Sequence, residues 1–347
     1  MLWVNRYYRA GMIPRIPARD DTPAWQRLLA RSITDPAELL RRLRLDPALL
    51  PAARAAAARF RLRVTLPWLA RIRPGDPHDP LLRQVLPLGE ELAPQPPGFG
   101  PDPVGDLAAG RAPGLLHKYH GRALLITTGA CAIHCRYCFR RHYPYGEHNA
   151  SAALEDSLAY LRRRPDIKEF ILSGGDPLML GDARLAALLD ALEALPHLRR
   201  LRLHSRLPVV LPQRITPTLV DRLAASRLAA VLVIHANHPR EIDDSVTEAL
   251  QALNRAGVRL FNQSVLLRGV NDDVDSLAEL SERLFDSGVQ PYYLHLLDPV
   301  AGAAHFEVPE AKARALHAAL AARLPGYLLP RLAREQAGAP AKTLLGA

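Results

Sequence analysis

Residues 123–138, ALLITTGACAIHCRYC, join a short apolar run that is typical of a buried β-strand to a loop that holds three cysteines. Cys131, Cys135 and Cys138 follow the spacing C-x3-C-x2-C and are the only cysteines among the 347 residues. An odd, clustered set does not make a disulfide framework and favours a reducing compartment. Three thiolates on one compact loop can bind three corners of a cubic iron–sulfur cluster and leave the fourth iron open to a ligand.

The alternative to such a cluster is a zinc ion held by the three cysteines together with His134 or His142. The corresponding rival function is a non-catalytic metal-binding module on a basic surface. The sequence contains no second C-x2-C pair, which weakens the zinc interpretation.

Outward from the cysteine loop, short β-type runs alternate with helical patterns. The expected strands are 123–127, 169–172, 199–204, 230–235, 259–264 and 292–297, and the expected helices lie near 152–163, 183–195, 218–225, 241–256, 273–286 and 309–323. This alternation implies a parallel sheet with right-handed crossovers. Six units are too few for a closed eight-stranded barrel. The sequence therefore predicts an α/β fold, a partial (β/α)6 TIM-like barrel with an N-terminal helical extension.

Three regions are expected along the chain. Residues 1–113 form an N-terminal helical region that ends in a Pro/Gly-rich connector, 86–113, which wraps over the main domain. Residues 114–325 form the partial barrel, and residues 326–347 form a C-terminal segment.

Composition and charge narrow the class of protein. The chain is 48% hydrophobic and 23% charged, as in globular proteins, and carries a net charge of +10. Arginines are scattered through helical stretches without interleaved aromatic residues, so we expect no nucleic-acid partner. We also expect no membrane partner and a cytoplasmic location, because no apolar run approaches the roughly 20 residues that span a bilayer and the first residues do not resemble a signal peptide.

Polar residues follow almost every expected strand. In a barrel of this kind the site lies at the C-terminal ends of the strands. The groups expected there are the three cysteines, Ser173, Gly174, Gly175 and Asp176, His204 and Ser205, His235, Gln263, and Asp298.

The cysteine loop with an aromatic residue before its last cysteine resembles the signature of the radical S-adenosylmethionine (radical SAM) enzymes. The resemblance implies that Cys131, Cys135 and Cys138 hold a [4Fe-4S] cluster whose open iron binds S-adenosylmethionine. It also implies that Tyr137 lies near the adenine. The methionine amino group is expected against Ser173, Gly174, Gly175 and Asp176, with further cofactor contacts from His235 and Gln263.

Several longer stretches are similar to the lysine 2,3-aminomutase family, which also needs pyridoxal phosphate. They include LLHKYHGRALL, CRYCFRRHYPYGE, LSGGDPLM, RLPVVLPQRIT, NQSVLLRGVND and PYYLHLLDPVAGAAHF. The resemblance implies that Lys342 attaches to the cofactor, that Arg122 and Lys118 bind its phosphate, and that Tyr119 packs on its ring. Judged by its position alone, Lys342 could equally be a mobile tail residue.

The same resemblance assigns the substrate, the free diamino acid L-lysine. Arg140 is expected to pair with its carboxylate, and Asp298 with its ε-ammonium. Glu335 stands where the family has a second acidic residue, an Asp. The implied reaction is isomerisation of L-lysine to (R)-β-lysine, with a separate reductant for the cluster.

Within the family, DPLLRQVLPLGEE, HSRLP and PRLARE resemble the shorter branch that supplies (R)-β-lysine for elongation factor P through a separate ligase. Because the chain ends soon after Lys342, we expect a simple oligomer, a monomer or a weak dimer. The alternatives are a radical SAM enzyme without pyridoxal phosphate and an aminomutase that serves another pathway.

Overall fold

The computed structural model describes residues 22–147 and 150–345, and its centre is one ten-stranded sheet whose strands lie in sequence order. Seven neighbouring strands are parallel. They are β3 (Arg122–Thr128), β4 (Glu169–Gly174), β5 (Arg200–Ser205), β6 (Ala229–Ile234), β7 (Arg259–Val265), β8 (Gln290–His295) and β9 (Arg331–Arg334). The six predicted strands are confirmed, and the short β9 is a seventh that the sequence did not reveal.

Antiparallel strands extend the sheet at both edges. β1 (Gly110–Ala112) and β2 (Leu115–Tyr119) pair beside β3, and β10 (Thr343–Leu344) pairs with β9. Within the described residues, β1 and β10 do not pair with each other, so the barrel stays open, as predicted.

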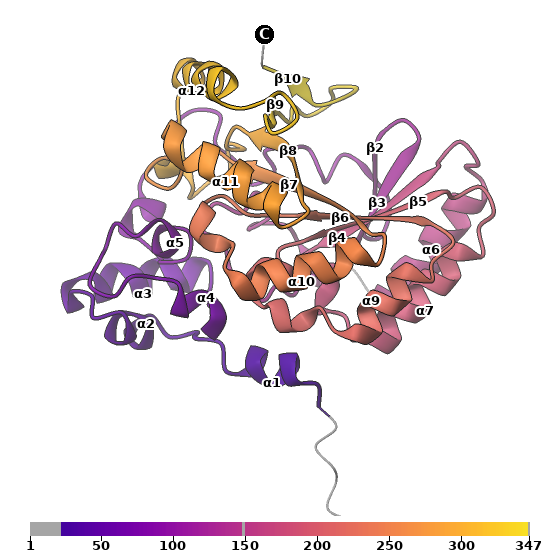
Figure 1. Ribbon diagram of the computed structural model, residues 1–347, viewed down its shortest axis with the longest axis horizontal. Coiled ribbons are helices and arrows are strands. Elements are labelled where there is room, and N and C mark those ends of the chain that lie inside the picture. Colours follow the sequence, from indigo (N-terminus) through magenta and orange to yellow (C-terminus); the bar gives the residue numbers. More distant parts are fainter. Residues whose placement is uncertain (1–21, 148–149, 346–347) are drawn as a thin grey trace, which may run out of the picture.

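The six predicted crossover helices are also present and lie along the outer face of the sheet (Figure 1). Side chains at their first turns explain where they begin: Thr216, Asp243 and Asp273 each accept a hydrogen bond from a backbone N–H of the first turn. The helices are α6 (Ala150–Arg162), α7 (Asp182–Glu193), α9 (Pro217–Ala224), α10 (Asp244–Arg255), α11 (Val274–Asp286) and α12 (Glu310–Arg323).

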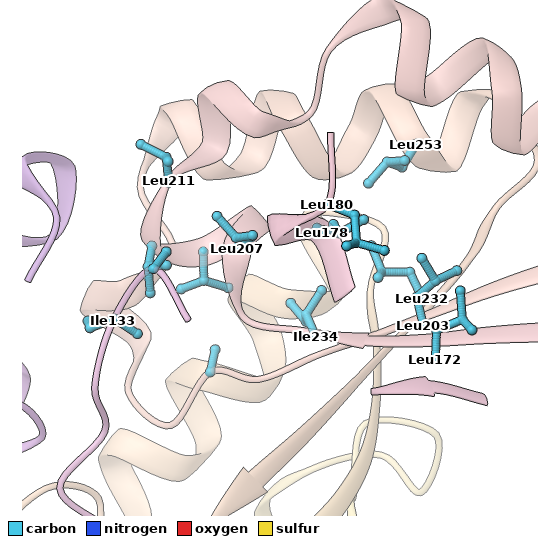
Figure 2. Packing of buried hydrophobic residues seen from close by; sticks show 14 of the residues in the cluster. Ile133, Leu172, Leu178, Leu180, Leu203, Leu207, Leu211, Leu232, Ile234 and Leu253 are labelled. Carbon is cyan, nitrogen blue, oxygen red and sulfur yellow. The ribbon is translucent and has the colours of Figure 1, made fainter. Parts of the chain in front are cut away.

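Leucines from strands and helices fill the layer between them. Leu172, Leu203 and Leu232 come from three adjacent strands, are almost fully buried and belong to the same apolar cluster as Leu253 of α10 (Figure 2). Burying a leucine side chain contributes about 1.5–3 kcal/mol, so this layer holds the strand ends in fixed positions.

Five α-helices precede the connector in the described part of the chain, while residues 1–21 lie outside the described residues. The N-terminal region that contains these helices packs on loops that follow the barrel strands. Arg71 donates to the carbonyl of Val209 at 2.6 Å, and Arg240 pairs with Asp79 at 2.7 Å. Its helices are α1 (Ala24–Ala30), α2 (Pro36–Arg42), α3 (Leu50–Arg59), α4 (Leu66–Ala70) and α5 (Pro80–Arg83).

The Pro/Gly-rich connector crosses the mouth of the barrel. Gly100 donates its N–H to Pro299 at 2.9 Å and accepts from the N–H of Ala301 at 2.9 Å, beyond β8. Farther along, the connector enters β1. This path carries Asp106 over the C-terminal ends of the strands. No helix in the described part of the chain is long and apolar enough to cross a membrane.

Candidate functional site

The cysteine loop is held by a close approach of two backbones. It begins just after β3, against the Gly174-Gly175 pair that ends β4. Gly174 has φ +122°, and a Cβ on Gly175 would lie 2.3 Å from the carbonyl oxygen of Ala130. Only glycine fits both positions. The expected Ser-Gly-Gly-Asp motif and the cysteine loop therefore do meet, backbone against backbone.

Asp176 is the acidic residue of that motif, and its carboxylate is hydrogen-bonded to other groups of the protein. Its carboxylate accepts hydrogen bonds from the Ser205 hydroxyl at 2.8 Å and from the backbone N–H groups of Leu178, Arg206 and Leu207. Burial raises its pKa to about 6 despite these donors. Asp176 thus ties the end of β4 to the turn after β5, and the backbone of the motif is what remains for a ligand.

The three cysteines form no disulfide and repel one another electrostatically. Burial, and then the neighbouring Cys138, raise the pKa of the Cys131 thiol; burial and Cys135 raise that of Cys138 to about 11. Three thiolates so close together need a positive centre between them, which an iron–sulfur cluster supplies. The donor set therefore fits the expected cluster.

The zinc alternative finds no support. In 22–147 and 150–345, no three Cys, His, Asp or Glu side chains are placed to hold one metal ion. One nitrogen of each histidine ring contacts a backbone carbonyl, with His134 Nδ1 2.8 Å from the carbonyl of Arg61 and His142 Nε2 3.0 Å from that of Ala301, so only the other nitrogen of each ring could bind a metal. A cluster gives each sulfur its own iron and does not require this tight convergence.

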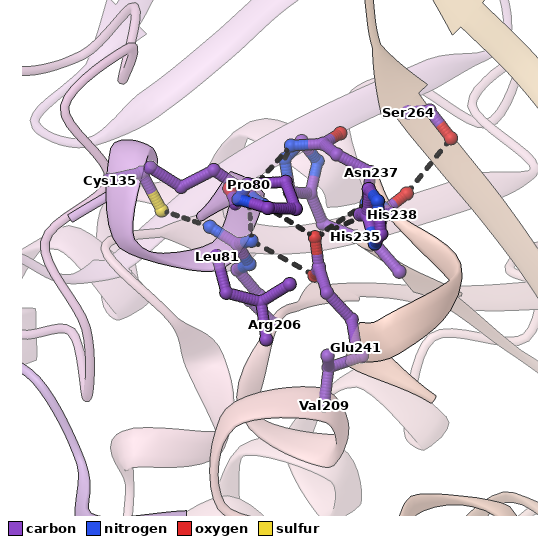
Figure 3. A network of polar contacts seen from close by, with 12 residues as sticks. Pro80, Leu81, Cys135, Arg206, Val209, His235, Asn237, His238, Glu241 and Ser264 are labelled. Atoms are coloured by element: carbon purple, nitrogen blue, oxygen red, sulfur yellow. Dashed lines mark hydrogen bonds and ion pairs between the residues drawn. The ribbon is translucent and has the colours of Figure 1, made fainter. Parts of the chain in front are cut away.

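Cys135 has a charged neighbour that the sequence did not reveal. Arg206 Nη1 donates to Cys135 Sγ at 2.8 Å, and Arg206 Nη2 bonds Gln84 at 2.6 Å and Glu241 at 3.0 Å (Figure 3). Its guanidinium also lies over the Trp68 ring, 4.7 Å from the centroid. These partners come from the N-terminal region and from the loop after β6, so no local pattern could bring them together.

Tyr137 and His235, both expected at the cofactor, are in contact. The Tyr137 hydroxyl lies 2.8 Å from His235 Nε2 and accepts from Asn237 Nδ2 at 2.7 Å, and the two rings stack with centroids 5.7 Å apart. The backbone of Gln263 hydrogen-bonds the His235 ring. We call the cysteine loop with these residues and Arg206 the cysteine side of the mouth.

A second cluster, which we call the lysine side, is a row of five side chains whose charges alternate in sign. We call this row the ladder. Lys342 Nζ lies 3.0 Å from Glu335, whose other oxygen is 3.1 Å from Lys118 Nζ. Lys118 is 2.6 Å from Asp106, which also pairs with Arg140 Nε at 2.6 Å. Four of the five residues were expected from the sequence. The fifth, Asp106, comes from the connector, where no motif marks it.

The ladder controls the protonation of its acids. Burial opposes ionisation of Glu335, but Lys342 and Lys118 bring its pKa down to about 2. Asp298, which faces the ladder, differs: burial and then Glu335 raise its pKa to about 7, although Lys342 and Lys118 oppose the rise. Asp298 is therefore poised to ionise when a further cation arrives.

Lys342 is an ordered residue and not part of a free tail. It directly precedes β10, which pairs with β9. Its Nζ lies 3.3 Å from His295 Nε2 and 5.5 Å from the centroid of the Tyr293 ring. Leu294, between these two, belongs to the apolar cluster under α11 and α12, so Tyr293 and His295 both face the interior of the barrel.

Arg122 and Tyr119 lie together beside the ladder. The Arg122 guanidinium lies over the Tyr119 ring, 4.5 Å from the centroid, and Tyr119 hydrogen-bonds Glu335. No ion pair joins Arg122 to a carboxylate in the part of the chain that the structure describes. Its charge is thus open to an anion, whereas Lys118 already contacts two acids. A lysine, an aromatic ring and a free guanidinium together fit pyridoxal phosphate.

The two sides meet at Arg140. Its Nη1 donates to the Ser173 hydroxyl at 3.1 Å, and its Nε belongs to the ladder. One side chain therefore links the motif beside the cysteine loop to the charges around Lys342. Ser173 was predicted to contact S-adenosylmethionine and Arg140 the substrate, and the structure brings the two side chains into contact.

Comparisons with known proteins identify the family. A model of the Radical SAM superfamily matches residues 125–281. L-lysine 2,3-aminomutase of Escherichia coli (strain K12) is 50% identical over 331 residues, 95% of each chain. L-lysine 2,3-aminomutase of Haemophilus influenzae is 46% identical over 96% of this chain and 98% of its own. L-lysine 2,3-aminomutase of Clostridium subterminale is 38% identical over 82% of this chain and 68% of its own.

Proposed function

We propose that this chain, which belongs to the lysine 2,3-aminomutase family within the radical SAM superfamily, moves the α-amino group of L-lysine to the β-carbon. As a member of this family it is an isomerase that uses a [4Fe-4S] cluster and S-adenosylmethionine. These cofactors supply a carbon radical that removes a hydrogen atom, and pyridoxal phosphate supplies a conjugated ring for the migrating nitrogen.

The observation that carries the proposal is the contact between the two sides of the mouth. A cysteine loop fitted for a cluster and a lysine fitted for pyridoxal phosphate open onto the same strand ends, joined through Arg140 and Ser173. A radical made at one side can then act on a substrate held at the other. Fixing reactants in this way removes much of the entropic barrier of a bimolecular step.

The chain's own residues have distinct tasks in this proposal. Lys342 attaches to pyridoxal phosphate, Arg122 and Lys118 bind its phosphate, and Tyr119 packs on its ring. Cys131, Cys135 and Cys138 hold the cluster. Tyr137, His235, Gln263 and the Ser173–Asp176 backbone surround S-adenosylmethionine.

Substrate recognition falls to three charged residues. Arg140 binds the carboxylate, and Asp298 with Glu335 binds the ε-ammonium. The raised pKa of Asp298, about 7, supports this role, because a bound ammonium would replace the proton as the partner of the carboxylate. Asp298→Ala should weaken the binding of L-lysine more than the binding of an analogue that lacks the ε-amino group. Equal losses for both compounds would remove Asp298 from recognition.

The decisive experiment is anaerobic incubation of the reconstituted protein with L-lysine, dithionite and the three cofactors, followed by chiral analysis of the product. We expect (R)-β-lysine, and none from Lys342→Ala. Turnover without pyridoxal phosphate would favour a radical SAM enzyme of another kind, and unaltered lysine would reject the proposal.

We assign the product to the modification of elongation factor P, on the resemblance of DPLLRQVLPLGEE, HSRLP and PRLARE to that branch of the family. The expected partners are a one-electron reductant and a separate β-lysine ligase. Mass analysis of elongation factor P, incubated with ligase, ATP and the enzyme's product, should show addition of one β-lysyl group. Unmodified factor would point to another use of β-lysine.

A further inference from the structure

His295 is the buried histidine in contact with Lys342, and none of the roles above uses it. It ends β8 and points into the barrel, two residues after Tyr293 in the sequence. Its Nε2 lies 3.3 Å from Lys342 Nζ, while Glu335 Oε2 lies 3.0 Å from the same nitrogen. The lysine nitrogen therefore has one charged and one neutral acceptor.

These two acceptors have opposite effects on the lysine. The Glu335 carboxylate stabilises the ammonium form of Lys342, and an ammonium has no lone pair with which to attach to pyridoxal phosphate. Glu335 is shared between Lys342 Nζ at 3.0 Å and Lys118 Nζ at 3.1 Å, so a proton on its carboxylate would weaken the pairing of both lysines. A second base is needed to free the amine.

We infer that His295 accepts the proton of Lys342 when that lysine attaches to pyridoxal phosphate. The N–H bond of the ammonium breaks, a bond forms between the proton and His295 Nε2, and the electron pair left on Nζ becomes the nucleophile. Attachment to the aldehyde carbon then releases one water. The proton returns to Nζ when the lysine is displaced. This inference rests on the proposed function, which assigns Lys342 to the cofactor.

The surroundings of His295 suit this exchange. Burial, and then the positive charge of Lys342, lower the pKa of His295, so the ring is neutral and free to accept while the lysine is charged. As the proton leaves Nζ, the second of these causes disappears and the ring becomes a better base. His204 and His235 also lie near. Lys342 lowers the pKa of His204, but in the described residues neither ring is hydrogen-bonded to Lys342 Nζ.

The test measures attachment separately from catalysis. Pyridoxal phosphate is added to protein that carries its cluster, samples are reduced with borohydride at intervals, and the mass of the peptide containing residue 342 reports covalent attachment. Equilibrium binding of the cofactor is measured in parallel. The variants are His295→Gln, His295→Phe and His295→Ala, with His78→Gln as the control on an exposed histidine.

We expect His295→Gln and His295→Phe to bind the cofactor but to attach it about 100-fold more slowly near pH 7, the usual contribution of a general base. The rate should approach that of the unmodified protein as the pH rises, because hydroxide then removes the proton. Added imidazole should restore the rate in His295→Ala, which leaves space for it.

Each outcome is decisive. Attachment at the normal rate and with the normal pH dependence in His295→Gln would overturn the role of His295. Slow attachment that neither pH nor imidazole restores would also overturn it, since His295 would then act only through packing. If the unmodified protein gains no label at Lys342, the proposed function fails instead, and His295 has no proton to accept.

Discussion

The three sulfurs of the cysteine side come from one loop, whereas the charges of the lysine side come from the connector, β2, the turn after the last cysteine and the segment between β9 and β10. The cysteine loop is fixed by backbone packing on Gly174 and Gly175. The lysine side is fixed by ion pairs between segments far apart in sequence. Local spacing builds the first centre, and long-range electrostatics builds the second.

The largest expected effect is complete loss of turnover, and the iron content then distinguishes the cysteine side from the lysine side. Cys135→Ala removes one cluster ligand, so bound iron and sulfide and all turnover should be lost while the melting temperature changes little. Lys342→Ala should abolish turnover but keep the full iron content, as measured by iron and sulfide analysis with EPR. Normal iron in Cys135→Ala would contradict the cluster assignment.

Next in size is the ion pair that the connector brings to the lysine side. Asp106→Asn leaves buried positive charge at Arg140 and Lys118 without its full partner, which costs about 3–5 kcal/mol of unfolding free energy. Denaturant titration measures this change. Asp275→Asn, which breaks an exposed pair with Arg323, should cost about 0–1 kcal/mol. Equal costs would mean that the ladder does not hold the lysine side together.

The pH dependence of stability tests the unusual protonation of Asp298. Folded Asp298 keeps its proton up to about pH 7, whereas the unfolded chain releases it near pH 4. The folded state therefore binds more protons in this window, and the unfolding free energy should fall as pH rises from about 4 to 7, by at most about 1.4 kcal/mol per unit.

Asp298→Asn should remove the share of this slope that Asp298 contributes, while Asp176, whose pKa is raised to about 6, keeps a smaller share below pH 6. Glu335 acts in the opposite sense and at lower pH, because its lowered pKa, about 2, stabilises the fold above about pH 4.5 and that contribution is lost on acidification. An unchanged slope between pH 4 and 7 in Asp298→Asn would show that Asp298 is ionised throughout.

The smallest expected effect concerns the cysteine side. Arg206→Gln removes a cationic donor to Cys135 Sγ. The Arg206 guanidinium stabilises the reduced cluster more than the oxidised one. The midpoint potential should fall by on the order of 60 mV, a tenfold change for one electron, with iron content retained. Arg222→Gln, on an outer helix, should leave the EPR-monitored potential unchanged. An unchanged potential in Arg206→Gln would limit Arg206 to packing.

Local patterns were sufficient for much of the molecule. The apolar runs and helix starts predicted six parallel strands and six crossover helices, and the cysteine spacing predicted the cluster loop. β9 was missed because four residues, RLAR, carry too little periodicity to reveal a strand. β1 and β2 were missed because they flank the turn at Gly114, within and beside a Pro/Gly-rich stretch.

The lysine side shows where such prediction stops. Lys342, Glu335, Lys118 and Arg140 were named from the family resemblance, yet nothing in the sequence showed that they touch. Asp106 and His295 were not named, because a lone acid in a loop and a lone histidine in a strand have no distinguishing spacing. Arg206 was expected at the end of its strand, but nothing in the sequence marked it as a partner of Cys135.

By itself, the sequence determined the barrel and the cysteine loop, because residue periodicity and short ligand spacing are local properties of the chain. The tertiary structure decided which distant charges share one buried mouth. Coulombic attraction and burial depend on distance in space, and only folding brings Asp106 to Lys118 and His295 to Lys342.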